Sequence, residues 1–89
     1  MPCVSRFHGI AILMYRNEGI HPGRPHFHAR IAEFEASFDI ETLELIAGSL
    51  PRRANRLVLR WARMHQRELL LNWDSLRSTG RITPIAPLP

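Results

Sequence analysis

The sequence predicts an α+β fold: a small antiparallel β-meander packed against one long C-terminal helix, with a short terminal strand or tail. Residues 26–47 alternate between apolar and polar side chains, which is the period of half-buried strands. Residues 51–77 carry apolar side chains at helical spacing between Pro51 and Gly80, which favour a helix start and a helix end. At 89 residues the chain is expected to form a single domain. Its expected parts are a mainly β region over 1–48, the helix over 51–77 and a tail over 78–89.

The expected strands follow one another along the first half of the chain. Residues 9–15 are a run of strand-favouring apolar side chains, and residues 17–25 form a loop because they contain two glycines and two prolines. The next strands are expected over 26–31, 34–40 and 43–47. In the last of them, the apolar face is continued by Leu43, Leu45 and Ala47.

A turn at Ala32-Glu33 sets the register of the central hairpin. Alanine is poor chemistry for a tight turn of this kind, which favours glycine or asparagine. The register matches the apolar faces of the two strands and pairs polar residues on the other face. The expected neighbours are Ile31 and Phe34, Ala29 and Ala36, Phe27 and Phe38, Arg30 and Glu35, and His26 and Asp39, with Glu44 beside Asp39 on the following strand.

The long helix is amphipathic. At about 1.5 Å per residue it extends for roughly 40 Å. Its apolar side is expected to lie on the sheet, and consists of Ala54, Leu57, Val58, Trp61, Leu69 and Leu76. The tail, with Ile82 and Ile85, is expected to add an edge strand before it frays.

The composition predicts a cytoplasmic location, and the chain is mildly basic. Cys3 is the single cysteine, so no internal disulfide can form, which suits a reducing compartment. The apolar run after Gly9 is too short for a signal peptide core or a membrane span. All twelve basic residues are arginine and the net charge is +4, which is compatible with nucleic acid or an acidic protein partner.

The segment around Phe27 presents two histidines together. His26 and His28 are two apart in a strand and therefore point to the same face. Two imidazoles can ligate one divalent metal, and Asp39, with Glu44 beside it on the following strand, would complete the site if the hairpin register holds. The alternatives are a catalytic histidine oriented by a carboxylate, or a solvated sheet face with cross-strand ion pairs. No cofactor is predicted, apart from this metal.

Three polar residues lie within the apolar arc of the helix. His65, Glu68 and Asn72 are expected on the side that faces the sheet, where unpaired polar groups are costly. Because His65 and Glu68 are three residues apart, they can touch. The group is interpreted either as a buried network that fixes how helix and sheet dock, or as part of a pocket. In the second case His65 and Glu68 would join His26 and His28 as catalytic residues.

Arginines gather on the opposite side of the helix. We call them the arginine stripe, and expect them to contact phosphates or an acidic partner, or simply to be solvated. No helix-turn-helix, zinc finger or RNA-binding strand accompanies them. The stripe consists of Arg52, Arg53, Arg56, Arg60, Arg63 and Arg67.

Segments spread over nearly the whole chain match a known family in order. They are Pro2–Tyr15 (PCVSRFHGIAILMY), Pro25–Ala29 (PHFHA), Thr42–Glu44, Leu50–Ala54, Trp61-Ala62, His65-Gln66, Glu68–Leu70 and Asn72-Trp73. Together they resemble the bacterial domain-of-unknown-function family DUF4160. The resemblance implies a small antiparallel sheet with a long C-terminal helix. It also implies a small protein partner of the DUF2442 family, encoded by an adjacent gene.

The leading functional hypothesis is a partner protein in a two-protein toxin–antitoxin or regulatory module. One alternative is a small nuclease or metal-assisted hydrolase that uses His26 and His28. Another is a DNA-binding regulator that lays the arginine stripe on phosphates. An exposed sheet edge would also support a homodimer.

Overall fold

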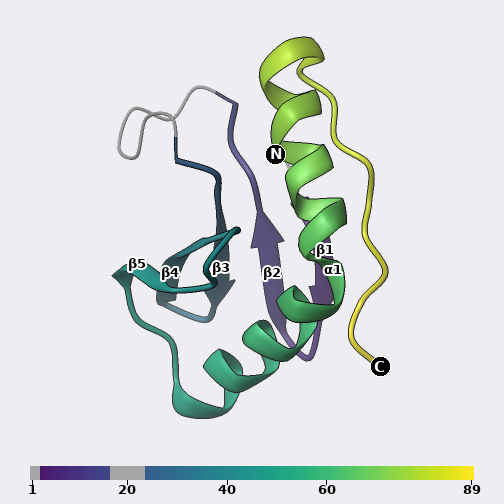
Figure 1. The fold of residues 1–89 in the computed structure, drawn as a ribbon. Helices are drawn as coiled ribbons and strands as arrows, with labels where there is room; N and C mark the ends of the chain where they lie inside the picture. The colour runs from purple at the N-terminus through teal and green to yellow at the C-terminus, as the bar shows by residue number, and fades with distance from the viewer. Residues whose placement is uncertain (1–2, 17–23) are drawn as a thin grey trace.

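The computed structural model describes residues 3–16 and 24–89, so the predicted loop over 17–25 lies mostly outside the described residues. It shows a five-stranded antiparallel sheet in the order β1-β2-β3-β4-β5 and one long helix (Figure 1), which confirms the predicted α+β meander. The elements are β1 (Cys3–Phe7), β2 (Ile10–Leu13), β3 (His26–Ile31), β4 (Phe34–Asp39), β5 (Leu45–Gly48) and α1 (Arg52–Thr79).

Strand β1 was not predicted from the sequence, because a bulge interrupts its alternation. The register with β2 shifts between Cys3 and Ser5. Val4 and Phe7 can therefore both be buried in the core although they are three residues apart. The connection to β2 passes through His8 and Gly9, whose φ angles are 50° and 79°. Positive φ at both positions is typical of the tightest hairpin turns.

The central hairpin has the predicted register. Ile31 pairs with Phe34 and Phe27 with Phe38, and the polar pairs His26–Asp39 and Arg30–Glu35 are also in place. The turn between these strands holds Ala32 at a φ of 52°. This left-handed backbone conformation is strained for alanine, because alanine has a Cβ atom that crowds the backbone there.

The prediction that Leu45 and Ala47 continue the buried apolar face of the sheet was wrong. Leu45 is 52% exposed and Ala47 is exposed as well. A second bulge lies in this strand, β5: Ser37 pairs with Ala47 and Phe38 with Leu45, so Ile46 has no partner on β4. The extra residue places Ala47 on the face of Ser37, whereas Leu45 lies opposite Phe38 in the edge strand of the sheet and is exposed there.

Helix α1 ends at Thr79 and is closed by Gly80, whose φ is 78° and whose N–H donates to the carbonyl of Leu76. The helix bends at His65, which has the non-helical angles φ −126° and ψ 21°. Next to the bend, the Gln66 amide donates to the carbonyls of Ile40 and Glu41, at 2.9 and 3.2 Å. The bend is therefore anchored to the loop that follows β4.

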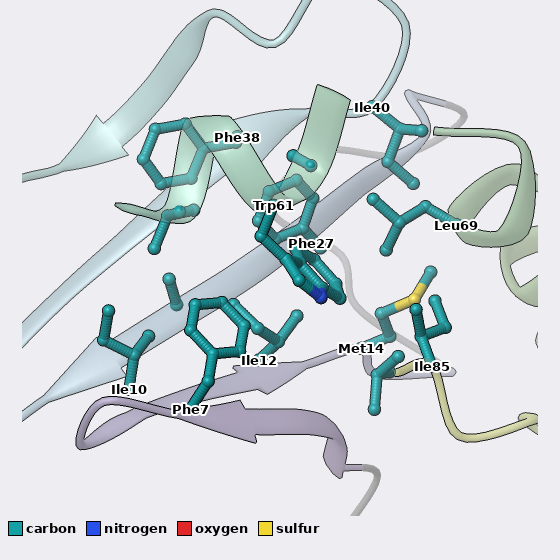
Figure 2. Packing of buried hydrophobic residues seen from close by; sticks show 14 of the residues in the cluster. Phe7, Ile10, Ile12, Met14, Phe27, Phe38, Ile40, Trp61, Leu69 and Ile85 are labelled. Carbon is teal, nitrogen blue, oxygen red and sulfur yellow. The ribbon is translucent and has the colours of Figure 1, made fainter. Parts of the chain in front are cut away.

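The core lies between the sheet and α1, with Trp61 at its centre (Figure 2). This side chain is fully buried, with its ring 5.4 Å from that of Phe7 and 6.1 Å from that of Phe27. The Phe27 ring in turn stacks on Phe38 at 5.4 Å. The apolar stripe of the helix thus meets the predicted apolar face of the hairpin.

The C-terminal tail runs back beside α1 (Figure 1) and is held at several points. The Trp61 indole N–H donates to the carbonyl of Ala86 at 2.8 Å. The Ile85 N–H donates to the carbonyl of Val4 in β1 at 2.9 Å. The expected edge strand does not form, and the expected fraying is wrong as well, because Ile85 and Leu88 are buried. Within residues 3–16 and 24–89, no helix is long and apolar enough to cross a membrane.

Candidate functional site

The histidine pair of β3 lies in a buried setting. His26 and His28 are 2% and 5% exposed, and their rings lie 5.3 Å apart, so a solvated sheet face is excluded. His26 also contacts the ring of Trp73 in α1 at 5.1 Å. Its Nδ1 lies 2.7 Å from the carbonyl oxygen of Arg24. Because a carbonyl can only accept, Nδ1 carries a proton and donates it.

His28 is held by polar groups of the neighbouring strand. Its Nδ1 lies 3.2 Å from the Ser37 hydroxyl and 3.4 Å from a Glu35 carboxylate oxygen. The Tyr15 ring packs against it at 5.0 Å. The two histidines thus pack with aromatic rings and bond to neighbouring strand and loop groups.

Asp39 lies opposite His26 in the register, but its carboxylate is engaged elsewhere. Oδ2 accepts from the Arg24 guanidinium at 2.6 Å. Oδ1 accepts from the backbone N–H groups of Glu41 and Thr42, at 2.7 and 2.9 Å. Burial alone would raise the pKa of Asp39, but these hydrogen bonds outweigh it and hold the pKa below its usual value.

The predicted metal site receives no third ligand from Asp39, because both of its oxygens already accept hydrogen bonds. Glu44 also stays outside: its backbone carbonyl accepts from the Asp39 N–H, and its side chain is exposed. Among the residues that the structure describes, no group of three or more His, Cys, Asp or Glu is arranged to hold a metal ion. Metal binding by His26 and His28 stays a prediction.

The second predicted pair forms at the bend of α1. The Nδ1 atom of His65 lies 2.5 Å from a Glu68 carboxylate oxygen, and the His65 ring packs on Trp61 at 5.4 Å. The expected burial of Glu68 was wrong, since its side chain is 50% exposed. Among the described contacts, this pair is separate from the pair on β3. Trp73, which contacts His26, lies about 12 Å further along the helix than His65.

Asn72 is buried, as predicted, but it docks the tail instead of the sheet. Its side-chain amide donates to the Thr83 carbonyl and accepts from the Thr83 N–H, both at 2.8 Å. Between α1 and the tail lies a groove of about 350 Å³. Its lining residues are Glu68, Leu71, Asn72, Ser75, Thr83, Pro84 and Ile85. We refer to it as the tail groove.

All six side chains of the arginine stripe are exposed. None of them makes an ion pair or side-chain hydrogen bond with another described residue, whereas Arg24 and Arg30 both pair with carboxylates. The sequence contains no acidic residue between Glu44 and Glu68. The first half of α1 is therefore a basic surface whose charge is not neutralised within the described structure.

Sequence reasoning missed Trp73 and Gln66 as residues that shape the site. Trp73 packs against His26, and Gln66 anchors the bend of α1. A tryptophan at the edge of an apolar stripe would have been a usable signal, because large aromatic side chains dominate cores. The Gln66 contact depends on where the loop after β4 lies, and the sequence has no local signal for that.

The fold and these features define a small α+β domain with a basic helix, a buried histidine pair and a groove beside its tail. The chain belongs to the DUF4160 family, a domain of unknown function, whose model matches residues 9–74, or 66 of the 89 residues. The family predicted from the sequence is thereby confirmed. Comparison with curated proteins and with solved structures finds no significant match.

Proposed function

We propose that the chain is a bacterial cytoplasmic partner protein, one half of a toxin–antitoxin or regulatory two-protein module. In this proposal the arginine stripe binds an acidic surface of a small protein, of the DUF2442 type that the family resemblance implies. The observation that supports it best is the exposure of all six arginines without a carboxylate partner among the described residues. Like charges on one helix face repel each other, and an acidic partner removes that cost.

An apolar side chain beside the stripe favours a protein partner over a polyanion alone. Met64 is 60% exposed, and it follows Arg60 by four residues, which makes the two neighbours on the helix surface. Arginine and methionine are both enriched at protein interfaces, where charged side chains surround an apolar centre. A phosphate backbone would use the arginines and leave Met64 without a contact.

The two alternatives have weaker support. A nuclease or metal-assisted hydrolase needs His26 and His28 to reach a substrate, and both side chains are buried. A DNA-binding regulator needs groups that read bases, and the stripe lies on a single helix that has, within residues 3–16 and 24–89, no second element beside it that is typical of base readout. Nucleic-acid binding is nevertheless a distinct outcome of the experiment below.

The proposal is tested by co-expressing the chain with the protein encoded beside it. We expect the two to co-elute at micromolar concentration, and a particle that contains only this chain and has twice its mass would instead indicate a homodimer. The variant Arg56→Gln/Arg60→Gln should weaken the complex at least tenfold, or about 1.4 kcal/mol. The control Arg6→Gln/Arg81→Gln removes the same charge, because both variants go from +4 to +2, at exposed sites outside the stripe.

Separate elution of the two proteins would overturn the proposal. If both double variants weaken the complex equally, the arginine stripe contributes only a non-specific charge effect to its affinity. Binding to duplex DNA that is tighter than binding to the protein, with an affinity that falls steeply with salt, would favour the regulator instead.

A further inference from the structure

The tail groove is formed where α1 and the C-terminal tail leave a hollow between them. Its volume of about 350 Å³ is at the lower end of the range for ligand pockets. The walls are mostly apolar, from Leu71 on the helix and from Pro84 and Ile85 on the tail. The tail is fixed at this level by the Asn72–Thr83 hydrogen bonds, so the groove is preformed.

One charged group lines the groove, the carboxylate of Glu68. One of its oxygens lies 2.5 Å from Nδ1 of His65, and the side chain makes no other hydrogen bond within the described structure. The contact with His65 fixes where the carboxylate points, while half of the side chain stays open to solvent. Glu68 thus offers an oriented negative charge next to an apolar hollow.

Two exposed apolar side chains flank Glu68 along the same helix. Leu71 follows it by three residues, a spacing that puts the two side chains side by side on the helix surface, and Met64 precedes it by four residues across the bend at His65. Leu71 is 62% exposed and Met64 is 60% exposed, although both are large hydrophobic residues. Along this part of α1 the surface is therefore apolar at Met64, acidic at Glu68 and apolar at Leu71. The tail groove lies at the Leu71 end.

We propose that the tail groove binds a peptide segment of a partner protein that carries an arginine or lysine between two aliphatic residues. The basic side chain pairs with Glu68, and the flanking aliphatic side chains cover Leu71 and Met64. Charge complementarity determines this choice. A segment with a carboxylate in the central position meets Glu68 as a like charge, and a fully apolar segment removes water from the exposed half of the Glu68 side chain without giving the carboxylate a second partner besides His65.

This surface borders the arginine stripe, because Met64 and Leu71 lie three residues before and four residues after Arg67. Arg67 precedes Glu68 by one residue, so the two side chains point about 100° apart around the helix axis. The basic segment therefore approaches Glu68 from the side of the tail, where Thr83, Pro84 and Ile85 line the groove. Binding in the tail groove goes beyond the proposed function, and it can succeed or fail whether or not the arginine stripe binds its partner.

The experiment is a titration of the full chain with three capped peptides, followed by backbone amide chemical shifts. The peptides are acetyl-Ala-Leu-Arg-Leu-Ala-amide and the versions with glutamine or glutamate in the central position. We expect the arginine peptide to bind with a dissociation constant on the order of 1 mM and to shift amides around Leu71, Ser75 and Thr83. The glutamine peptide should bind about three- to fivefold more weakly, and the glutamate peptide more weakly still.

Two isosteric variants separate the groove carboxylate from general charge. Glu68→Gln should reduce binding of the arginine peptide to the level of the glutamine peptide. Asp74→Asn removes the same charge from an exposed position of α1 that does not line the groove, and should leave all three affinities unchanged. Leu71→Ala should weaken all three peptides together, because it removes apolar wall and no charge.

The proposal is overturned if the arginine and glutamine peptides bind the wild-type chain equally, or if Glu68→Gln and Asp74→Asn have the same effect. It is also overturned if no shifts occur up to about 5 mM peptide, or if the shifts map to the arginine stripe or the sheet.

Discussion

Asn72 and Thr83 are joined by a pair of hydrogen bonds, one in each direction and each 2.8 Å long. The side chain of Asn72 acts here as a substitute for a strand neighbour of the tail, since it satisfies both the N–H and the carbonyl of Thr83. Only a side-chain amide provides a donor and an acceptor at this spacing. This pair explains why a buried asparagine lies on the apolar side of α1, and why the tail packs beside the helix.

Replacing Asn72 with alanine should lower the free energy of unfolding by about 1–3 kcal/mol, because both backbone groups of Thr83 lose their partner in a partly buried place. Asn72→Asp should be worse, since its carboxylate would face the Thr83 carbonyl. The measurement is chemical denaturation. Asn55→Ala is the control: it makes the same change on the same helix, at a side chain with no hydrogen bond in the described structure. A loss as large for Asn55 as for Asn72 would contradict this role.

The lowered pKa of Asp39 predicts how the stability of the protein depends on pH. Burial raises its pKa, but the hydrogen bonds from Arg24, Thr42 and Glu41 outweigh this and leave the pKa below its usual value. The folded state therefore binds the proton less tightly than the unfolded state, whose pKa is about 3.9. The resulting stabilisation is complete above that pH and is lost as pH falls through the folded pKa.

The variant Asp39→Asn should accordingly be less stable than wild type at pH 7, by roughly 1–3 kcal/mol. The difference should shrink as the solution is acidified below about pH 4. Denaturation midpoints measured across this range provide the test. The control is Asp74→Asn, because the Asp74 carboxylate is exposed and has no side-chain partner among the described residues. A constant difference between Asp39→Asn and wild type at all pH values would show that the carboxylate charge plays no part.

The prediction that alanine is poorly suited to the turn of the central hairpin can be tested at Ala32. Its φ of 52° is a conformation that glycine adopts without strain and alanine does not. Ala32→Gly should therefore stabilise the protein by up to about 1 kcal/mol, after the greater flexibility of glycine in the unfolded chain is subtracted. The control Ala47→Gly, in strand β5, should destabilise by roughly 0.5–1 kcal/mol. A destabilised Ala32→Gly variant would mean that the alanine methyl group makes a contact worth more than the strain.

The hairpin register could be predicted from the sequence because two constraints agreed, the alternation of side chains and a two-residue turn. The same reasoning failed at Cys3–Phe7 and at Ala47, where a bulge adds one residue and shifts the faces. A bulge depends on contacts with the neighbouring strand, so alternation within one strand does not reveal it. Exposure of the arginine stripe followed directly from helical spacing.

The burial of the candidate site could not be predicted in the same way. Alternation shows that His26 points away from Phe27, but not whether anything covers that side. The side chain of Trp73 in α1 covers His26. Trp61 of the same helix packs against Phe27 on the other face of the strand. The helix bends at His65 between these two tryptophans. No proline or glycine marks the bend, and these are the residues by which a sequence usually signals one.

The histidine pair provides the last prediction, which separates a structural role from a chemical one. His26 donates from Nδ1 to the Arg24 carbonyl and packs on Trp73. His26→Ala removes the donor and leaves a cavity, so it should cost roughly 2–4 kcal/mol. His26→Asn keeps an N–H close to the position of Nδ1 and should recover part of that loss. If the role is structural, thermal stability falls in the order wild type, His26→Asn, His26→Ala, and partner binding measured below each melting temperature is retained. If the role is chemical, His26→Asn already abolishes function in a protein of nearly wild-type stability. The buried position of the ring and its bond to a backbone carbonyl lead us to expect the first result.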